Sequence, residues 1–102
     1  MQQTERMEIF IKIGRQASNL SGYTSKGYGI LIEGKKVTVE WGKIFKVDRK
    51  YYWAGYNLPV IRIRCFGSIK EAERFKSERL TRRNKEGYKR LPLGTNISYR
   101  KY

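Results

Sequence analysis

Apolar and polar side chains alternate along several stretches of the chain, and this two-residue period predicts half-buried β-strands. In residues 7–13, every second position is Met or Ile. Residues 27–33 and 36–47 predict a second and a third strand, joined by the glycine-first pair Gly34-Lys35 that suits a tight hairpin. Residues 14–26, rich in Ser, Asn, Gly and Lys, predict a surface loop.

Residues 58–66 alternate again and predict a further strand. Arg62 and Arg64 point to one side of this strand. The other side carries Ile61, Ile63 and Cys65. If the helix that follows covers this aliphatic side, both arginines lie on an exposed face of the sheet.

The period then changes to that of a helix. Ser68 and Glu71 form a capping box at its start, and Gly87 can adopt the left-handed conformation that closes it. An apolar stripe broad enough to lie on a sheet is formed by Ile69, Ala72, Phe75 and Leu80. Lys85 lies in the last turn, where a cation suits the negative end of the helix dipole.

Together these elements predict an α+β fold, a small antiparallel β-sheet of about four strands with one α-helix packed across one face. We expect a flexible N-terminus over residues 1–6, one domain over residues 7–90, and a C-terminal tail or short strand over residues 91–102. The length of 102 residues suits a single domain.

The net charge of the chain limits the classes of partner that we expect it to bind. The chain has 23 Lys and Arg against 9 Asp and Glu, a net charge of +14. Such an excess attracts polyanions, so nucleic acid is the leading expected partner, followed by an acidic membrane surface and then by an acidic protein. The chain has no histidine, a single cysteine and no clustered carboxylates, so we expect no metal, no cofactor and no enzymatic activity.

The hydropathy pattern bears on location. No stretch approaches the roughly 20 apolar residues of a membrane span, and no early segment has the features of a signal peptide. We therefore expect no membrane partner and a cytoplasmic location, with association to a nucleoid or nucleus where the ligand is DNA.

Basic residues concentrate in the predicted helix and its exit. Residues 74–90 hold eight basic side chains and two acidic ones. We expect phosphate contacts from Arg79, Arg82, Arg83, Lys89 and Arg90. The alternative is a solvated helix face with local ion pairs, such as Glu78 with Arg82.

The predicted strands add further candidates. Arg62 and Arg64 would offer a flat basic surface to a sugar-phosphate backbone, or would stack on neighbouring Tyr rings with no ligand. Trp41 shares a side with Val37 and Val39, and by alternation alone it is a core residue.

Residues 48–57 predict a loop or a ragged hairpin tip, rich in aromatic residues, which we call the aromatic loop. Arg49, Lys50 and Trp53 interleave cations with rings there, the combination that single-strand binders use to stack bases. The alternative is a lid over one end of the core.

Two local patterns resemble the WGR domain family. The first is Trp41-Gly42-Lys43. The second is Phe66-Gly67-Ser68-Ile69-Lys70-Glu71-Ala72, closed by Lys85-Glu86-Gly87-Tyr88. Members of this family fold as a small antiparallel sheet with a helix across it, and occur in DNA-dependent poly(ADP-ribose) polymerases and in short bacterial proteins.

The resemblance implies that Trp41 lies against DNA at a strand break, with Lys43 beside it. The family usually has Arg at this third signature position, and Lys keeps the charge but not the planar fork of donors. The sequence therefore predicts a non-catalytic DNA-binding protein that grips the backbone, ends or nicks with weak sequence preference. The alternatives are binding of single-stranded DNA or RNA through the aromatic loop, and a protein-interaction adaptor that docks an acidic partner.

Overall fold

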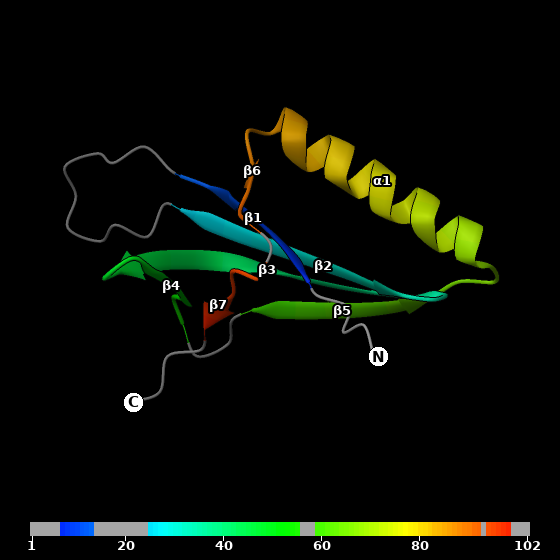
Figure 1. The fold of residues 1–102 in the computed structure, drawn as a ribbon, viewed down its shortest axis with the longest axis horizontal. Helices are drawn as coiled ribbons and strands as arrows, with labels where there is room; N and C mark the ends of the chain where they lie inside the picture. Colours follow the sequence, from blue (N-terminus) through cyan, green and yellow to red (C-terminus); the bar gives the residue numbers. More distant parts are fainter. Residues whose placement is uncertain (1–6, 14–24, 56–58, 93, 99–102) are drawn as a thin grey trace.

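A computed structural model describes residues 7–13, 25–55, 59–92 and 94–98. The predicted flexible N-terminus and most of the predicted loop over 14–26 lie outside these residues. The described elements, in chain order, are β1 (Glu8–Lys12), β2 (Lys26–Glu33), β3 (Lys36–Val47), β4 (Lys50–Trp53), β5 (Val60–Cys65), α1 (Ile69–Lys85), β6 (Lys89–Arg90) and β7 (Ile97–Ser98). Figure 1 shows α1 lying over one side of the strands.

The strands form one sheet with the order β6-β1-β2-β3-β4-β7, and β5 pairs with β3. The long strand β3 pairs with two strands along one edge. Its residues 36–41 pair with β5, and its residues 44–47 pair with β4. All pairs are antiparallel except β4 with β7, which is parallel. The α+β class and the helix across the sheet are confirmed.

The predicted strand number is too low, because the described residues form seven strands. The additional strands are short. β4 lies within the residues predicted as a loop, β6 at the helix exit, and β7 in the predicted tail. Segments of two to four residues carry too little alternation to be recognised as strands, and only their pairing with longer neighbours reveals them.

The predicted ends of α1 are confirmed. The Ser68 hydroxyl accepts a hydrogen bond from the Glu71 amide at 3.2 Å, as a capping box requires. Gly87 has a φ of 98°, the left-handed conformation that ends many helices. Of the predicted apolar stripe, Ala72, Phe75 and Leu80 pack on the sheet. The fourth residue, Ile69, is 53% exposed and is not part of this packing.

One face of the sheet packs under α1. The buried residues there come from the hairpin of β2 and β3 and from the helix, and are Tyr28, Ile30, Val37, Val39 and Ala72. Trp41, Phe75 and Leu80 pack against them and are half-buried. This face holds the first of two hydrophobic clusters.

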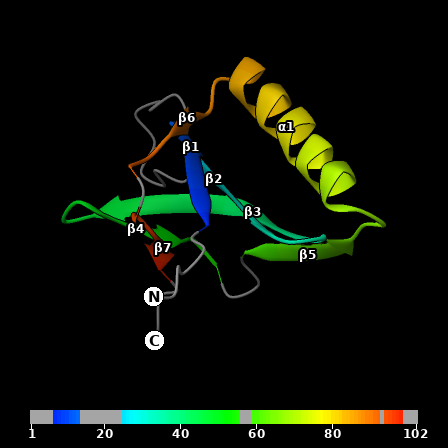
Figure 2. The same ribbon diagram turned by 45° about the vertical axis from the view of Figure 1, so that its right-hand side comes forward.

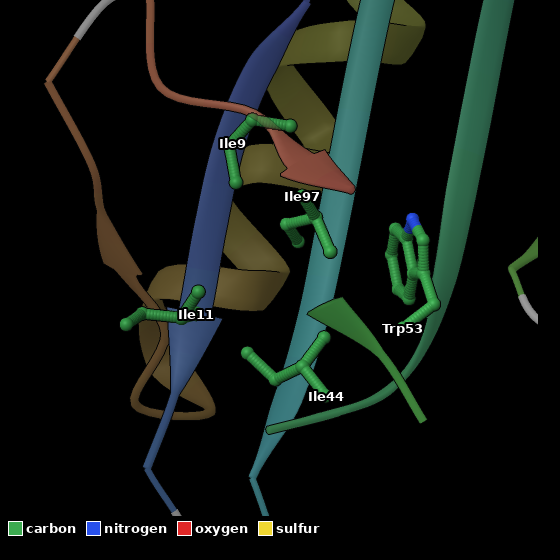
Figure 3. Packing of buried hydrophobic residues seen from close by; sticks show 5 residues of the cluster. All are labelled: Ile9, Ile11, Ile44, Trp53 and Ile97. Atoms are coloured by element: carbon green, nitrogen blue, oxygen red, sulfur yellow. The ribbon is translucent and has the colours of Figure 1, made fainter. Parts of the chain in front are cut away.

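The second cluster lies on the opposite face, where β4 and β7 fold over β1 and β2. Its buried members are Ile9, Ile11, Ile44, Trp53 and Ile97. Figure 3 shows these side chains in front of the strands, with α1 behind. Gly27 makes this packing possible, because a Cβ atom there would lie 2.6 Å from Ile97 Cδ1 and 2.8 Å from Ile44 Cγ2.

The expected orientation of β5 is wrong. Arg62 lies opposite Val39 and Arg64 opposite Val37, and residues directly opposite in an antiparallel pair project to the same face. Both arginines therefore lie on the α1 side of the sheet. Ile61 and Ile63 lie on the other side and are 48% and 61% exposed. Alternation shows which residues share a face of a strand, but not which face the helix covers.

Glu40 lies on the face of the sheet opposite α1 and gives a prediction about the pH dependence of stability. Its neighbours across the sheet are Gly29 and Ile61, and burial raises the pKa of its carboxyl above 4.5. The folded state thus disfavours the ionised form, so the contribution of Glu40 favours folding below pH 4.5 and is lost as the pH rises through the folded-state pKa.

We expect Glu40→Gln to be more stable than the wild type near neutral pH, with the difference vanishing below pH 4.5. Urea denaturation followed by circular dichroism, near neutral pH and below pH 4.5, measures the free energy of unfolding of both proteins. Glu73→Gln, at an exposed position of α1, is the matched control. Equal stability of Glu40→Gln and the wild type at neutral pH would contradict the argument.

Candidate nucleic-acid interface

A groove of about 520 Å³ lies between α1 and strands β3 and β5. Figure 2 shows α1 rising from the end of β5 towards β6, so that the helix crosses the sheet obliquely. The groove is lined by Tyr28, Val37, Val39, Trp41, Arg62, Ile63, Arg64, Phe75, Arg79 and Arg83. Two pairs of arginines, one from β5 and one from α1, thus meet over an apolar and aromatic floor. We call this hollow the arginine groove.

Three of these arginines lie on aromatic rings. The Arg83 guanidinium carbon is 4.6 Å from the centre of the Tyr28 ring, and that of Arg79 is 4.9 Å from the centre of Phe75. Arg64 lies over Phe66 and Phe75 at 5.4 and 5.3 Å. Such contacts are worth about 0.5–2 kcal/mol each and hold the planar cations at the groove.

Arg62 and Trp41 differ from these neighbours. Among the described residues, no ring lies under the Arg62 guanidinium and no carboxylate pairs with it. No ring or cation of the described residues stacks on Trp41, which is half-buried on the floor. The alternative for Arg62 and Arg64, stacking on Tyr rings, is not found among the described residues, because Arg64 stacks on Phe66 and Phe75 and the arginine over a Tyr ring is Arg83. The described residues thus leave the Arg62 guanidinium and the Trp41 ring unstacked and unpaired.

Two buried polar atoms of the groove have no hydrogen-bond partner among the described residues, the Tyr28 hydroxyl and Arg83 Nε. Tyr28 is 1% exposed, and burial raises the pKa of its hydroxyl, while the nearby Arg83 opposes this shift. Burial by itself would lower the pKa of Arg83, but its hydrogen bond to Glu86 at 2.7 Å raises it overall. The groove thus holds a permanent cation beside an unsatisfied hydroxyl.

Beyond the groove, three lysines form a row across neighbouring strands. Lys12 of β1 lies opposite Lys26 of β2, and Lys26 lies opposite Lys43 of β3. Lys43 is two residues from Trp41, so this lysine row faces the same side as α1. All three are exposed, and none pairs with a carboxylate among the described residues. Like charges directly opposite destabilise a sheet, so the row has no evident role in folding.

One of the three candidate ligand contacts in the predicted aromatic loop is buried. Trp53 is 1% exposed in the cluster opposite α1, because its partner across β3 and β4 is the core residue Ile44. The prediction that Trp53 stacks on a ligand is therefore wrong. Arg49 is exposed in the turn between these strands with a φ of 68°, and Lys50 is exposed at the start of β4. Both lie outside the groove lining.

The predicted basic cluster of the helix divides into separate groups. Arg79 and Arg83 line the arginine groove, whereas Arg82 and Lys89 are exposed outside it. Arg90 lies 3.6 Å from the Glu8 carboxylate, which Lys76 also binds. Glu78 with Arg82, the example given for the alternative of a solvated helix face, is not among the ion pairs of the described residues, whereas Arg83 pairs with Glu86.

Sequence reasoning missed several residues of the surface. Tyr28 and Phe75 were expected only as strand and core residues, and they form part of the groove. Lys26 falls at the end of the loop predicted over residues 14–26. The sequence does contain a signal that places Lys26 in the sheet. The hairpin turn at Gly34-Lys35 fixes a register in which Lys26 faces Lys43.

Comparison of the chain with protein-family models, curated proteins and solved structures gives no match. The WGR resemblance therefore stays a prediction that rests on its motif residues. In the described part of the chain, no helix is both long and apolar enough to span a membrane. Nor do the described residues bring together three His, Cys, Asp or Glu side chains that could hold a metal ion.

Proposed function

We propose that the protein is a non-catalytic nucleic-acid-binding protein whose ligand lies in the arginine groove. The observation that carries this proposal is the meeting of Arg62 and Arg64 with Arg79 and Arg83 around an aromatic floor. Guanidinium groups bind phosphate through two parallel hydrogen bonds, and aromatic rings bind nucleobases. The net charge of +14 would speed the approach of a polyanion.

The ligand we favour is DNA, held through its backbone and at ends or nicks, as the WGR resemblance implies. The groove offers cations and rings rather than paired amide or carboxylate groups, so sequence preference would be weak. An acidic protein partner is the second candidate function, because its carboxylates would also bind these arginines. The half-buried, unstacked Trp41 supports nucleic acid over such a partner.

Fluorescence anisotropy with labelled intact duplex, nicked duplex and single strand tests this proposal. If the four groove arginines each neutralise one phosphate, log affinity for duplex will fall with log salt at a slope of about −3.6. Heparin and polyglutamate serve as competitors. Displacement by polyglutamate as readily as by DNA would overturn the nucleic-acid proposal and favour the adaptor.

A further inference from the structure

We infer that the lysine row is a second phosphate site, and that row and groove together hold one unpaired strand of nucleic acid along β3. This inference rests on the proposed nucleic-acid binding, and it makes an unpaired strand the ligand in place of the duplex ends or nicks that the WGR resemblance implies. It is carried by the placement of Arg64, Arg62, Trp41 and Lys43 in consecutive rows on one face of the sheet.

The spacing of these rows suits an extended strand. Arg64, Arg62, Trp41 and Lys43 occupy the rows of β3 residues 37, 39, 41 and 43, each two residues from the next. A β-strand rises about 3.3–3.4 Å per residue, so the rows recur about every 6.7 Å. Successive phosphates of an extended single strand lie a similar distance apart. In a duplex each strand winds around the helix axis, so after a few nucleotides its phosphates no longer follow the straight line of these rows.

The position of Trp41 also favours an unpaired strand. Its ring lies on the floor of the arginine groove, with α1 on one side and β5 on the other. A base within a duplex presents only its edges, since its faces are stacked on its neighbours. An unpaired base can lay its face on an aromatic ring, which is worth about 1–3 kcal/mol per base.

The lysine row supplies the phosphate contact beyond that base. Neighbouring strands lie about 4.8 Å apart, so the three ammonium groups can converge on one phosphate. The described acidic residues that form ion pairs bind elsewhere, to Lys36, Lys76, Arg83 and Arg90. A bound phosphate would offset the repulsion within the row.

The test is a variant in which the row is neutralised, Lys12→Gln with Lys26→Gln and Lys43→Gln. We expect it to bind oligothymidylate about 10-fold more weakly than the wild type, with the salt slope reduced by about 0.7 because one phosphate contact is lost. The matched control removes the same charge from exposed lysines outside both sites, with Lys35→Gln, Lys70→Gln and Lys85→Gln. Thermal unfolding of both variants checks the fold.

Oligothymidylates of increasing length add a geometric readout. Affinity for the wild type should rise until the oligomer spans the distance from Arg64 to Lys43, about four nucleotides, and then level off. The neutralised variant should level off at a shorter length. We also expect the wild type to prefer oligothymidylate to duplex of equal length.

Three outcomes separate this inference from the proposed function. Equal losses in the neutralised variant and its control, or tighter binding of duplex, would overturn the inference while leaving nucleic-acid binding in place. No binding of either nucleic acid by the wild type would overturn the proposed function and the inference together.

Discussion

Replacement of Trp53 by alanine is expected to lower the free energy of unfolding by about 3–5 kcal/mol. Trp53 is 1% exposed and packs with Ile9, Ile11, Ile44 and Ile97, so its removal leaves a cavity that rigid neighbours cannot fill. Domains of this kind have about 5–15 kcal/mol of stability in total. The variant should therefore be partly or wholly unfolded in urea concentrations that the wild type withstands, as circular dichroism would record.

The two tryptophans of the chain serve as controls for each other. Trp41 is only half-buried, so Trp41→Ala should cost less stability than Trp53→Ala and should weaken nucleic-acid binding in the folded protein. Trp53→Phe retains most of the buried volume, and we expect it to bind as the wild type does. A stable Trp53→Ala protein that has lost binding would show that the ring contacts ligand and not core.

Reversal of the charge at Arg62 should have the largest effect on binding. Arg62→Glu removes a charge-assisted hydrogen bond worth about 1.5–3 kcal/mol, which corresponds to about 10- to 150-fold in affinity. The new carboxylate would in addition repel phosphate. Because Arg62 pairs with no carboxylate or ring among the described residues, the melting temperature should change little. Anisotropy titration at fixed salt measures the affinity.

Arg74→Glu is the matched control for this variant. Arg74 is exposed on α1 beside Lys70 and Glu73, outside the arginine groove, and the change in net charge is the same. In this control only the long-range attraction between the net positive charge and the nucleic acid should weaken. The loss of affinity should be smaller than for Arg62→Glu and should decrease as salt is added. Equal losses at the two positions would show that net charge, and not the groove, governs binding.

The groove exists because α1 covers the sheet incompletely. Ala72 is buried and lets the helix approach the hairpin of β2 and β3, while Phe75 reaches sideways to Phe66 with ring centres 5.1 Å apart. The oblique path of α1 leaves the rows of Trp41 and Arg62 uncovered on the β5 side. A helix aligned with β3 would bury these residues, and the cations would then need partners within the protein.

Much of the fold follows from local sequence. The alternation of β1, the hairpin of β2 and β3, and the helix N-cap at Ser68 all appear in the structure, because each depends on residues close together in the chain. The candidate site was predicted in part. Trp41, Arg62, Arg64, Arg79 and Arg83 were named as binding residues and line one groove, whereas Trp53, named with them, lies in the core.

By itself, the sequence determined the α+β class, the strongly basic surface and the residues that share each face of a strand. Only the tertiary structure decided that Arg62 and Arg64 face α1, that Ile61 and Ile63 face away from it, and that Trp53 is buried. The reason is that period and capping are properties of a few neighbouring residues. The pairing of β5 and β4 with β3, and the face that the helix covers, result from contacts between segments far apart in the chain.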